Sequence, residues 1–379
     1  MKILGKLFLI LIWSVSGYAQ SLSDFKRDLN ATLNNKISEA KADSLMERHW
    51  GLLSWFYNID PDVKAFPLKE MISDPIYHNN IDKLFADTGL RINTLACLLA
   101  SSTHDISKVV DVKKVLERSK YKNIFAAKSL LLLGEKDVTL IAKCIVAHQL
   151  NESVQYLTID FLNVEPGLLE KFALDSLFSR QKEMQYLAVR ALGVITPKPS
   201  NEELLRQAVN KYELEMKGWP IAALAHYKAK NMLSIVMPYL SNGTLKRISW
   251  KALMASTSVN DVVYVNQIIA TGMDDPDFLN ALLESENEIY LKSWLSIARE
   301  GKLPSNYFFS INDNEAIKND KYFNDFCEII TNSMNEKHAY YLMQYFEGRK
   351  DTASIDFLKK CLTHPLTSIS ENAKQLLNN

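Results

Sequence analysis

The stretch EMQYLAVRALGVI, residues 183–195, is the clearest indication of the fold in this 379-residue chain. Its apolar residues recur every three or four positions, which places them on one face of a helix. Two members of that face, Ala188 and Ala191, are small, so a neighbouring helix is able to approach closely. The stretch therefore predicts a helix that packs against other helices along this face.

Similar stretches return at near-regular intervals along the chain. Their alignment places one small residue in each: Ala96, Ala126, Thr158, Ala188, Ala222 and Ser249. The intervals between successive members are 30, 32, 30, 34 and 27 residues. The repetition indicates a building block and not a single active site.

A second amphipathic stretch lies between successive copies, as in residues 138–150 and 201–215. In the latter, Ser200 and Glu203 have the spacing of a capping box at the start of the helix. A helical hairpin cannot cover its own apolar face and has to stack on its neighbours. The sequence therefore predicts an all-α fold, an α-solenoid of stacked antiparallel helix pairs with a period of about 31 residues.

Two of these stretches carry a resemblance to a known family. YLAVRALGVI (186–195) and ENAKQLLNN (371–379) share a central alanine and a closing leucine, and in this they resemble the HEAT-like repeats of the HEAT and armadillo superfamily. The similarity covers roughly residues 89–271, although HEAT units are longer, at about 40–47 residues. The signature phrases of tetratricopeptide and ankyrin repeats are missing. The resemblance implies a solenoid that binds macromolecules along its concave face, and it implies no catalytic residue.

The start of the chain predicts export. Lys2 and Lys6 are followed by an apolar run from Leu7 to Trp13 and by small residues up to Ala19, the order typical of a secretory signal peptide. The apolar run is too short to span a bilayer. We expect cleavage after Ala19 and a mature protein that is periplasmic or secreted, with no stable membrane insertion after cleavage.

The rest of the chain divides into three predicted regions. Residues 20–88, with a long helix expected over 37–58, form an N-terminal helical cap. Residues 89–271 hold the regular HEAT-like repeats, and residues 272–379 hold irregular helical repeats. Turn residues interrupt the pattern at LPSNYFFSINDNEA, residues 303–316, which predicts a hinge or a change of curvature there.

Composition excludes several classes of function. Lysine plus arginine equals aspartate plus glutamate at 44 each, so the chain has no electrostatic attraction for nucleic acid. The seven histidines show no zinc-ligand spacing, and no P-loop or GxSxG motif is present. We therefore expect no metal, no cofactor, no nucleic-acid partner and no catalytic residue.

A His-Asp pair and the four cysteines are possible reactive groups, but a structural role is favoured for both. In THDIS, residues 103–107, a capping role for Thr103 or Asp105 is favoured over a catalytic His-Asp pair, because adjacent side chains point in different directions. The four cysteines are able to pair in an oxidising compartment, and Cys327 and Cys361 lie 34 residues apart. Stacked helices lie about 8–10 Å apart, whereas a disulfide needs Cα atoms within about 7 Å, so buried free thiols are favoured.

Candidate partner contacts come first from the column two residues after the small residue. It carries Lys128, Asp160, Arg190 and Lys251. The alternation of Lys128, Asp160 and Arg190 favours a ladder of ion pairs between neighbouring repeats ahead of ligand binding. Lys128, Arg190 and Lys251 are nevertheless the charged residues of this column that we expect to contact a partner.

Aromatic residues give the second set of candidates. Ten of them crowd the forty residues from 307 to 346: Tyr307, Phe308, Phe309, Tyr322, Phe323, Phe326, Tyr340, Tyr341, Tyr345 and Phe346. Most are expected in the core. Aromatic rings offer a large contact area at a small cost in entropy, so Tyr340, Tyr341 and Tyr345 are candidate partner contacts.

Two functions from different classes stay open at this point. The first is an exported, non-catalytic α-solenoid that acts as a protein-protein interaction scaffold in the cell envelope or outside the cell. The second is a carbohydrate-binding protein or an enzyme, with its site near the aromatic segment 300–346. Helical repeats without a catalytic set of residues favour the first.

Overall fold

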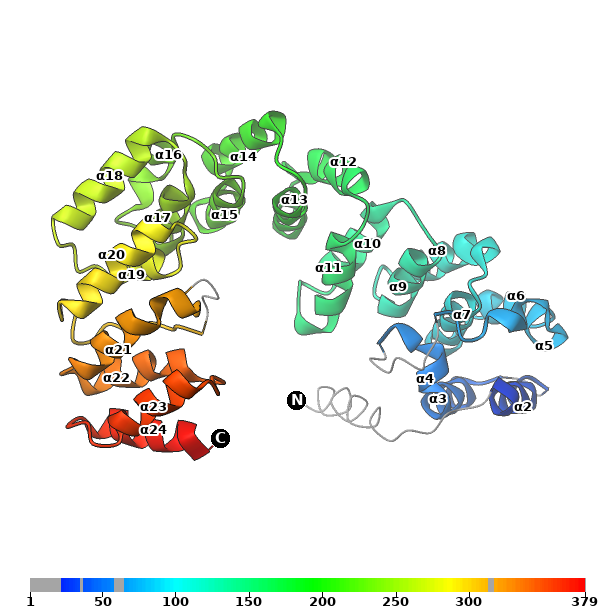
Figure 1. The fold of residues 1–379 in the computed structure, drawn as a ribbon. Coiled ribbons are helices and arrows are strands. Elements are labelled where there is room, and N and C mark those ends of the chain that lie inside the picture. The colour runs from blue at the N-terminus through cyan, green and yellow to red at the C-terminus, as the bar shows by residue number, and fades with distance from the viewer. Residues whose placement is uncertain (1–21, 35–36, 58–64, 313–316, 379) are drawn as a thin grey trace. The chain divides into compact units, whose positions relative to one another are not determined.

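The computed structural model describes residues 22–34, 37–57, 65–312 and 317–378. They form α-helices, short 3-10 helices and connecting segments, with no strand among them, which confirms the predicted all-α, solenoid-like fold (Figure 1). None of these helices has both the length and the apolar character that a membrane span requires. The predicted signal peptide, residues 1–19, lies outside the described residues.

Contacts between residues group the chain into two units, Met1–Ala191 and Leu192–Asn379, which are described separately. The α-helices of unit 1 are α2 (Leu22–Leu33), α3 (Glu39–Arg48), α4 (Trp50–Leu53), α5 (Pro75–His78), α6 (Ile81–Ala86), α7 (Leu90–Thr103), α8 (Val109–Arg118), α9 (Ile124–Leu132), α10 (Val138–Ala147), α11 (Gln155–Leu162) and α12 (Pro166–Ser176). The boundary between the units falls within α13 (Lys182–Val194).

Unit 2 continues the same pattern of alternating helices. Its α-helices are α14 (Pro199–Lys211), α15 (Gly218–His226), α16 (Met232–Val236), α17 (Lys246–Ala255), α18 (Val259–Ala270), α19 (Pro276–Leu283), α20 (Glu288–Arg299), α21 (Phe323–Thr331), α22 (Glu336–Met343), α23 (Thr352–Cys361) and α24 (Thr367–Asn378). Short 3-10 helices, among them η1 (Trp55–Tyr57), η3 (Ile106–Lys108), η7 (Asp320–Tyr322) and η8 (Gln344–Phe346), join some of them.

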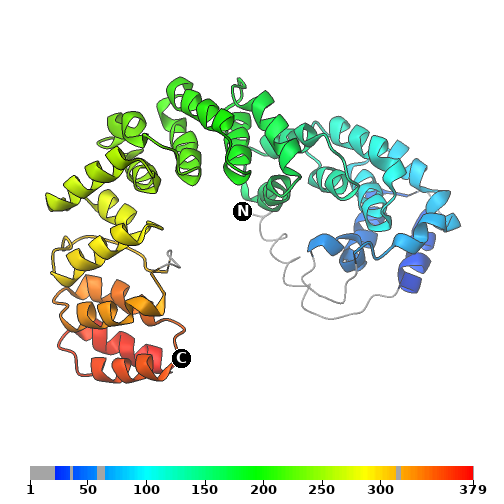
Figure 2. The ribbon, with the colours of Figure 1, turned by 45° about the horizontal axis from the view of Figure 1, so that its top comes forward.

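Alternate helices stack on one another to form a layer within each unit. In unit 1, α9 packs against α7 and α11, and in unit 2, α17 packs against α15 and α19 (Figure 2). The intervening helices contact them from the other side, as α8 does with α9 and α18 with α17. Near the C-terminus α24 packs on both α22 and α23. This is the stacking of helix pairs that the repeated sequence predicts.

The small residues of the repeat explain the close packing of the stacked helices. Ala96, Ala126, Ala188 and Ser249 are fully buried, and Thr158 is half-buried. The predicted register is wrong at Ala222, which is exposed. In α15 the core is contacted by Ile221, Ala223 and Leu224, and at 3.6 residues per turn these leave Ala222 on the opposite side of the helix.

Two other local predictions are also wrong. The expected capping box at Ser200 and Glu203 does not form, because α14 begins at Pro199 and Ser200 already lies inside its first turn. Proline suits the first position of a helix, where its missing N–H is not needed. The single helix expected over 37–58 ends at Arg48, since His49 leaves the helical conformation and its Nε2 lies 3.0 Å from Oδ2 of Asp28.

The predicted cap and the free thiols are confirmed. Asp105 caps η3, because its carboxylate accepts a hydrogen bond from the Ser107 amide at 3.1 Å. All four cysteines are free, and all but the half-buried Cys327 are fully buried. Burial raises the pKa of Cys144 and Cys361 to about 12 and that of Cys327 to about 11.

Some helices are capped by a residue of the next repeat. The buried carboxylate of Asp261, on α18, accepts hydrogen bonds from the amides of Met232 at 2.7 Å and Leu233 at 3.2 Å, at the start of α16. The Ser256 hydroxyl donates to the same carboxylate at 2.6 Å. Such a cap satisfies amides that a helix leaves unpaired and also joins consecutive repeats.

Candidate interaction surface

The first charged candidate, Lys128, is a structural residue. On α9 it is only 8% exposed, forms an ion pair with Asp160 on α11, and lies 5.3 Å from the ring centroid of Phe56. This pair confirms the first step of the predicted ladder. It also corrects the expectation that Lys128 contacts a partner, because its ammonium group is enclosed by its own unit.

The ladder does not continue to Arg190. Within the described part of unit 1, Arg190 makes no ion pair with Asp160, and its Nη1 instead donates to the Tyr186 hydroxyl at 2.9 Å. Its guanidinium carbon lies 5.7 Å from the ring centroid of Tyr186. Arg190 is exposed on α13, as a partner contact requires.

In unit 2, Lys251 is arranged similarly to Lys128 of unit 1, since each pairs with a carboxylate of a neighbouring repeat. It extends from α17 to an ion pair with Glu284, the C-cap residue of α19, and Arg247 pairs with the same carboxylate. The Lys251 side chain is 41% exposed, so it is reachable from solvent. Its charge is nevertheless already balanced in part by the neighbouring repeat.

Six of the ten aromatic residues of the C-terminal segment are buried: Tyr307, Phe309, Tyr322, Phe326, Tyr345 and Phe346. Tyr345 stacks on Phe326 with ring centroids 4.1 Å apart, and its hydroxyl donates to the Asn319 carbonyl at 3.1 Å. The Arg349 guanidinium also lies against the Tyr345 ring, 4.3 Å from the ring centroid. Tyr345 is therefore a core residue, which corrects its prediction as a surface contact.

Three aromatic residues lie together at the surface of unit 2 and form what we name the aromatic patch: Phe308, Tyr340 and Tyr341. Phe308 is 60% and Tyr340 52% exposed, and Tyr341 between them is half-buried. The ring of Tyr341 meets Phe308 at 6.2 Å and 82°, and Tyr340 at 5.4 Å and 77°. Both contacts are edge-to-face, so the three rings do not form one flat platform.

The aromatic patch is rooted in a buried cluster of rings. Tyr341 contacts Phe309, with ring centroids 5.2 Å apart, and Phe309 contacts Trp294 and Tyr307 at the same distance. The Tyr307 hydroxyl accepts a hydrogen bond from Trp294 Nε1 at 3.3 Å and donates to Asn280 Oδ1 at 2.9 Å. Tyr341 is therefore held in place from beneath.

The irregular segment that carries Phe308 is tied to α22 and η8. His338 Nε2 lies 2.9 Å from the Pro304 carbonyl, Asn335 donates to the Ser305 carbonyl at 3.3 Å, and the Ile311 amide donates to Gln344. Burial lowers the pKa of His338, and the charge of neighbouring Lys337 lowers it further, against the opposing effect of the bond to Pro304. The predicted break in the pattern is thus a segment hydrogen-bonded to α22 and η8, which come after α21 in the chain. Residues 313–316 lie outside the described residues.

The charge beside the patch comes from Lys337. On α22, Tyr340 and Tyr341 follow Lys337 by three and four residues. This spacing places both rings on the same face of the helix as the lysine. Lys337 is exposed and forms no ion pair with any described residue. Nearby Glu336 instead accepts hydrogen bonds from the Thr367 and Ser368 amides at the start of α24, at 3.0 and 2.9 Å.

Phe308 and Lys337 were not among the residues predicted from the sequence as partner contacts. Successive side chains of an extended segment point to opposite sides, so in Tyr307-Phe308-Phe309 the middle ring is separated from the other two. Three consecutive aromatic residues do not show in the sequence which of them is exposed, so the structure was needed to identify Phe308. The position of Lys337 on the face of Tyr340 and Tyr341 is readable from helical spacing.

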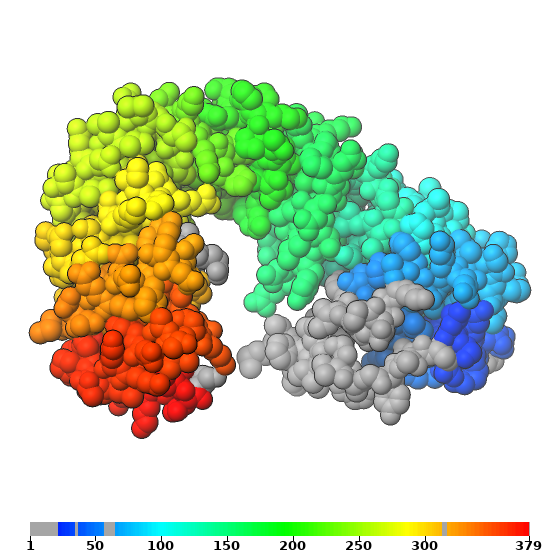
Figure 3. All heavy atoms as spheres, in the orientation of Figure 1, coloured from blue at the N-terminus to red at the C-terminus, as the bar shows by residue number. Residues whose placement is uncertain are grey.

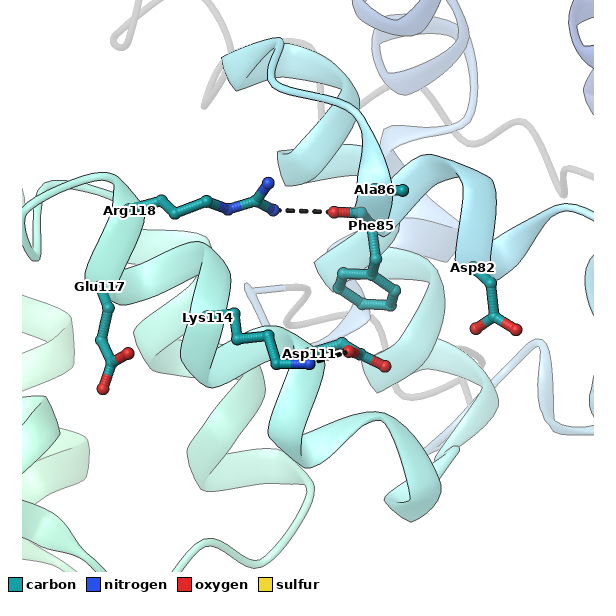
Figure 4. Close-up of a pocket in the computed structure, with 7 residues that line it drawn as sticks. All are labelled: Asp82, Phe85, Ala86, Asp111, Lys114, Glu117 and Arg118. Atoms are coloured by element: carbon teal, nitrogen blue, oxygen red, sulfur yellow. Dashed lines mark hydrogen bonds and ion pairs between the residues drawn. The ribbon is translucent and has the colours of Figure 1, made fainter.

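Unit 1 contains a hollow of about 610 Å³ between α6 and α8 (Figure 4), lined by Asp82, Phe85, Ala86, Asp111, Lys114, Glu117 and Arg118. Arg118 donates to the Phe85 carbonyl at 2.8 Å, and Lys114 donates to Asp111 at 3.3 Å. Lys108 pairs with Asp82 at 2.5 Å. Most of these charges are thus engaged by their own unit, and the hollow offers no set of groups that converge on a ligand.

Neither a search for metal ligands in the described part of the chain nor a comparison with known proteins indicates a specific reaction or ligand. Among the described residues, no group of three or more His, Cys, Asp and Glu side chains is placed to hold a metal ion. No model of a known protein family matches the chain, and a search of curated proteins found no significant match. The aromatic patch is accordingly the candidate site with the most specific geometry. In Figure 3 the atoms of α22, the helix that carries Tyr340 and Tyr341, are coloured orange.

Proposed function

We propose that this protein is an exported, non-catalytic helical-repeat scaffold that binds a partner protein through the aromatic patch. The observation that carries the proposal is a pair of exposed rings, Phe308 and Tyr340, that contact Tyr341, whose own ring packs on the buried Phe309. Binding surfaces owe much of their affinity to a few aromatic side chains, and rings held in place before binding lose little entropy. The resemblance to HEAT-like repeats supports the same conclusion.

The edge-to-face geometry favours a protein over a carbohydrate as the ligand. A sugar ring packs its flat face on a broad aromatic face, whereas Phe308 and Tyr340 stand nearly perpendicular to Tyr341 between them. Rings set at such angles offer both faces and edges to a branched aliphatic or aromatic side chain. Carbohydrate binding is the second candidate function, and the exposed tyrosine favours it.

Site-specific photo-crosslinking in the native host tests the proposal. A photoreactive phenylalanine replaces Tyr340, and in a matched control it replaces Tyr156, which is 60% exposed on α11 of unit 1. We expect one discrete protein adduct from position 340 that disappears when Phe308→Ala is added. Equal adducts from both positions, or none from position 340, contradict the proposal. An adduct that contains glycan supports the second candidate.

Export is tested separately by N-terminal sequencing of the protein purified from its host. We expect Gln20 as the first residue, because the small residue Ala19 ends the predicted signal peptide. A protein that retains Lys2 and Lys6 in the cytoplasm contradicts this part of the proposal and leaves the crosslinking result to be judged independently.

A further inference from the structure

Lys337, on the face of α22 that carries Tyr340 and Tyr341, has no partner of opposite charge among the described residues. Glu336 is bonded to the start of α24, Glu347 accepts from Asn312 at 2.7 Å, and Glu300 pairs with Lys302 at 2.6 Å. Lys337 has no such partner among the described residues. A ligand that brings a carboxylate to Lys337 therefore gains an interaction that unit 2 itself does not supply.

The spacing between this cation and the rings matches that of a polypeptide. Lys337 lies one helical turn before Tyr340 and Tyr341, a rise of about 5 Å along α22. In an extended chain, residues i and i+2 lie on the same side, about 7 Å apart. A carboxylate and an apolar side chain two residues apart are therefore able to reach Lys337 and the tyrosine rings of α22 together.

Resting on the proposed function, we infer that the aromatic patch takes an extended segment of its partner in which Asp or Glu lies two residues from an apolar side chain. The apolar side chain packs against the exposed rings of Phe308 and Tyr340. The carboxylate pairs with the Lys337 ammonium. The rings supply most of the affinity, and the lysine supplies the preference for acidic segments.

Selection from a displayed library of random heptapeptides tests the inference directly. The bait is the mature chain, residues 20–379, and a parallel selection uses the double variant Phe308→Ala/Tyr340→Ala. We expect peptides enriched on the natural chain to carry Asp or Glu two positions from Leu, Ile or Phe, and this enrichment to vanish on the double variant. Circular dichroism checks that the variants retain the helix content of the natural chain.

Charge reversal isolates the role of the lysine. Lys337→Glu is expected to weaken binding of the enriched peptides roughly three- to tenfold, as for an exposed ion pair turned into a repulsion, and to select Lys or Arg in their place. Lys230→Glu, an exposed lysine in the connection before α16, makes the same change in net charge and is the matched control. It is expected to leave both affinity and selected sequences unchanged.

Three outcomes overturn the inference. They are enriched peptides without an acidic preference, enrichment that Lys337→Glu does not alter, and displacement of the peptides by an oligosaccharide digest of the host envelope. Each is distinguishable from failure of the proposed function. A partner protein crosslinked at position 340 in cells keeps the scaffold proposal even if its binding segment is not acidic.

Discussion

Replacement of His338 tests how the segment beneath the aromatic patch is held. His338 is 6% exposed, and its Nε2 lies 2.9 Å from the Pro304 carbonyl. Because that carbonyl also accepts from the Tyr307 amide at 2.9 Å, loss of the imidazole does not leave it unpaired. The cost of His338→Phe, which keeps an aromatic ring, is therefore that of one net hydrogen bond, about 1 kcal/mol.

Hydrogen exchange on peptides that cover residues 303–312 measures this cost locally. A loss of about 1 kcal/mol corresponds to roughly fivefold faster exchange in the phenylalanine variant. His338→Gln, which retains a donor, is expected to restore part of the protection. His226→Gln, at an exposed histidine of α15, is the control and is expected to change nothing.

The pH dependence of the difference has a definite sign. Burial lowers the pKa of His338 in the folded protein below the value of about 6.5 for an unfolded histidine. The open state therefore binds more protons, and acid favours opening in the natural chain. Protection relative to His338→Phe is fully present above about pH 6.5 and is lost as the pH falls below it. Equal exchange at about pH 8, or a difference that grows in acid, refutes the reasoning.

Three other perturbations have expected outcomes. Asp261→Ala removes the acceptor of three hydrogen bonds and should lower the free energy of unfolding of unit 2 by about 3–4 kcal/mol in urea titrations. Asp160→Ala should cost about 1–3 kcal/mol by leaving the buried Lys128 unpaired, and Lys128→Met should recover most of this loss. Thiol-reagent titration at neutral pH should be slow until urea is added, because burial raises the pKa of Cys97 and raises that of Cys327 to about 11.

Each of these has a control or a contrary result. Asp356→Ala removes an exposed carboxylate 3.8 Å from Lys359 and should cost less than about 1 kcal/mol; a cost equal to that of Asp261→Ala would show that the buried cap is not special. Additive effects of the changes at 128 and 160 would contradict their coupling. Rapid reaction of several thiols in the folded protein would contradict the burial of the cysteines.

The stacking of helices was predictable because it depends on a local pattern. Small residues near every thirtieth position mark the buried face, and Ala126 and Ala188 lie where the repeat places them. The details that failed depend on single residues outside the pattern. Pro199 begins α14 before the expected cap, and α3 ends before His49, whose side chain contacts Asp28 and Phe25.

The candidate surface was predictable only in part, for a different reason. Tyr340 is at the surface as expected, but the burial of Tyr345 depends on its stacking with Phe326 of α21, a different helix, which no periodicity connects to it. The burial of Lys128 was likewise not predictable, because the ring of Phe56 that contacts it comes from a segment far away in the sequence. Exposure of a ring or a charge is a property of its neighbours in space.

The hydrogen bonds and ion pairs between consecutive repeats limit how this chain is able to evolve. Asp261 completes a helix of the preceding repeat, and Lys128 needs the carboxylate of the repeat that follows it. Deletion or exchange of one repeat would therefore separate groups that satisfy each other, even though the helical pattern would survive. Gain and loss of whole repeats, the usual route of change in solenoids, should be disfavoured in this chain relative to substitution on its exposed faces and variation in its connections.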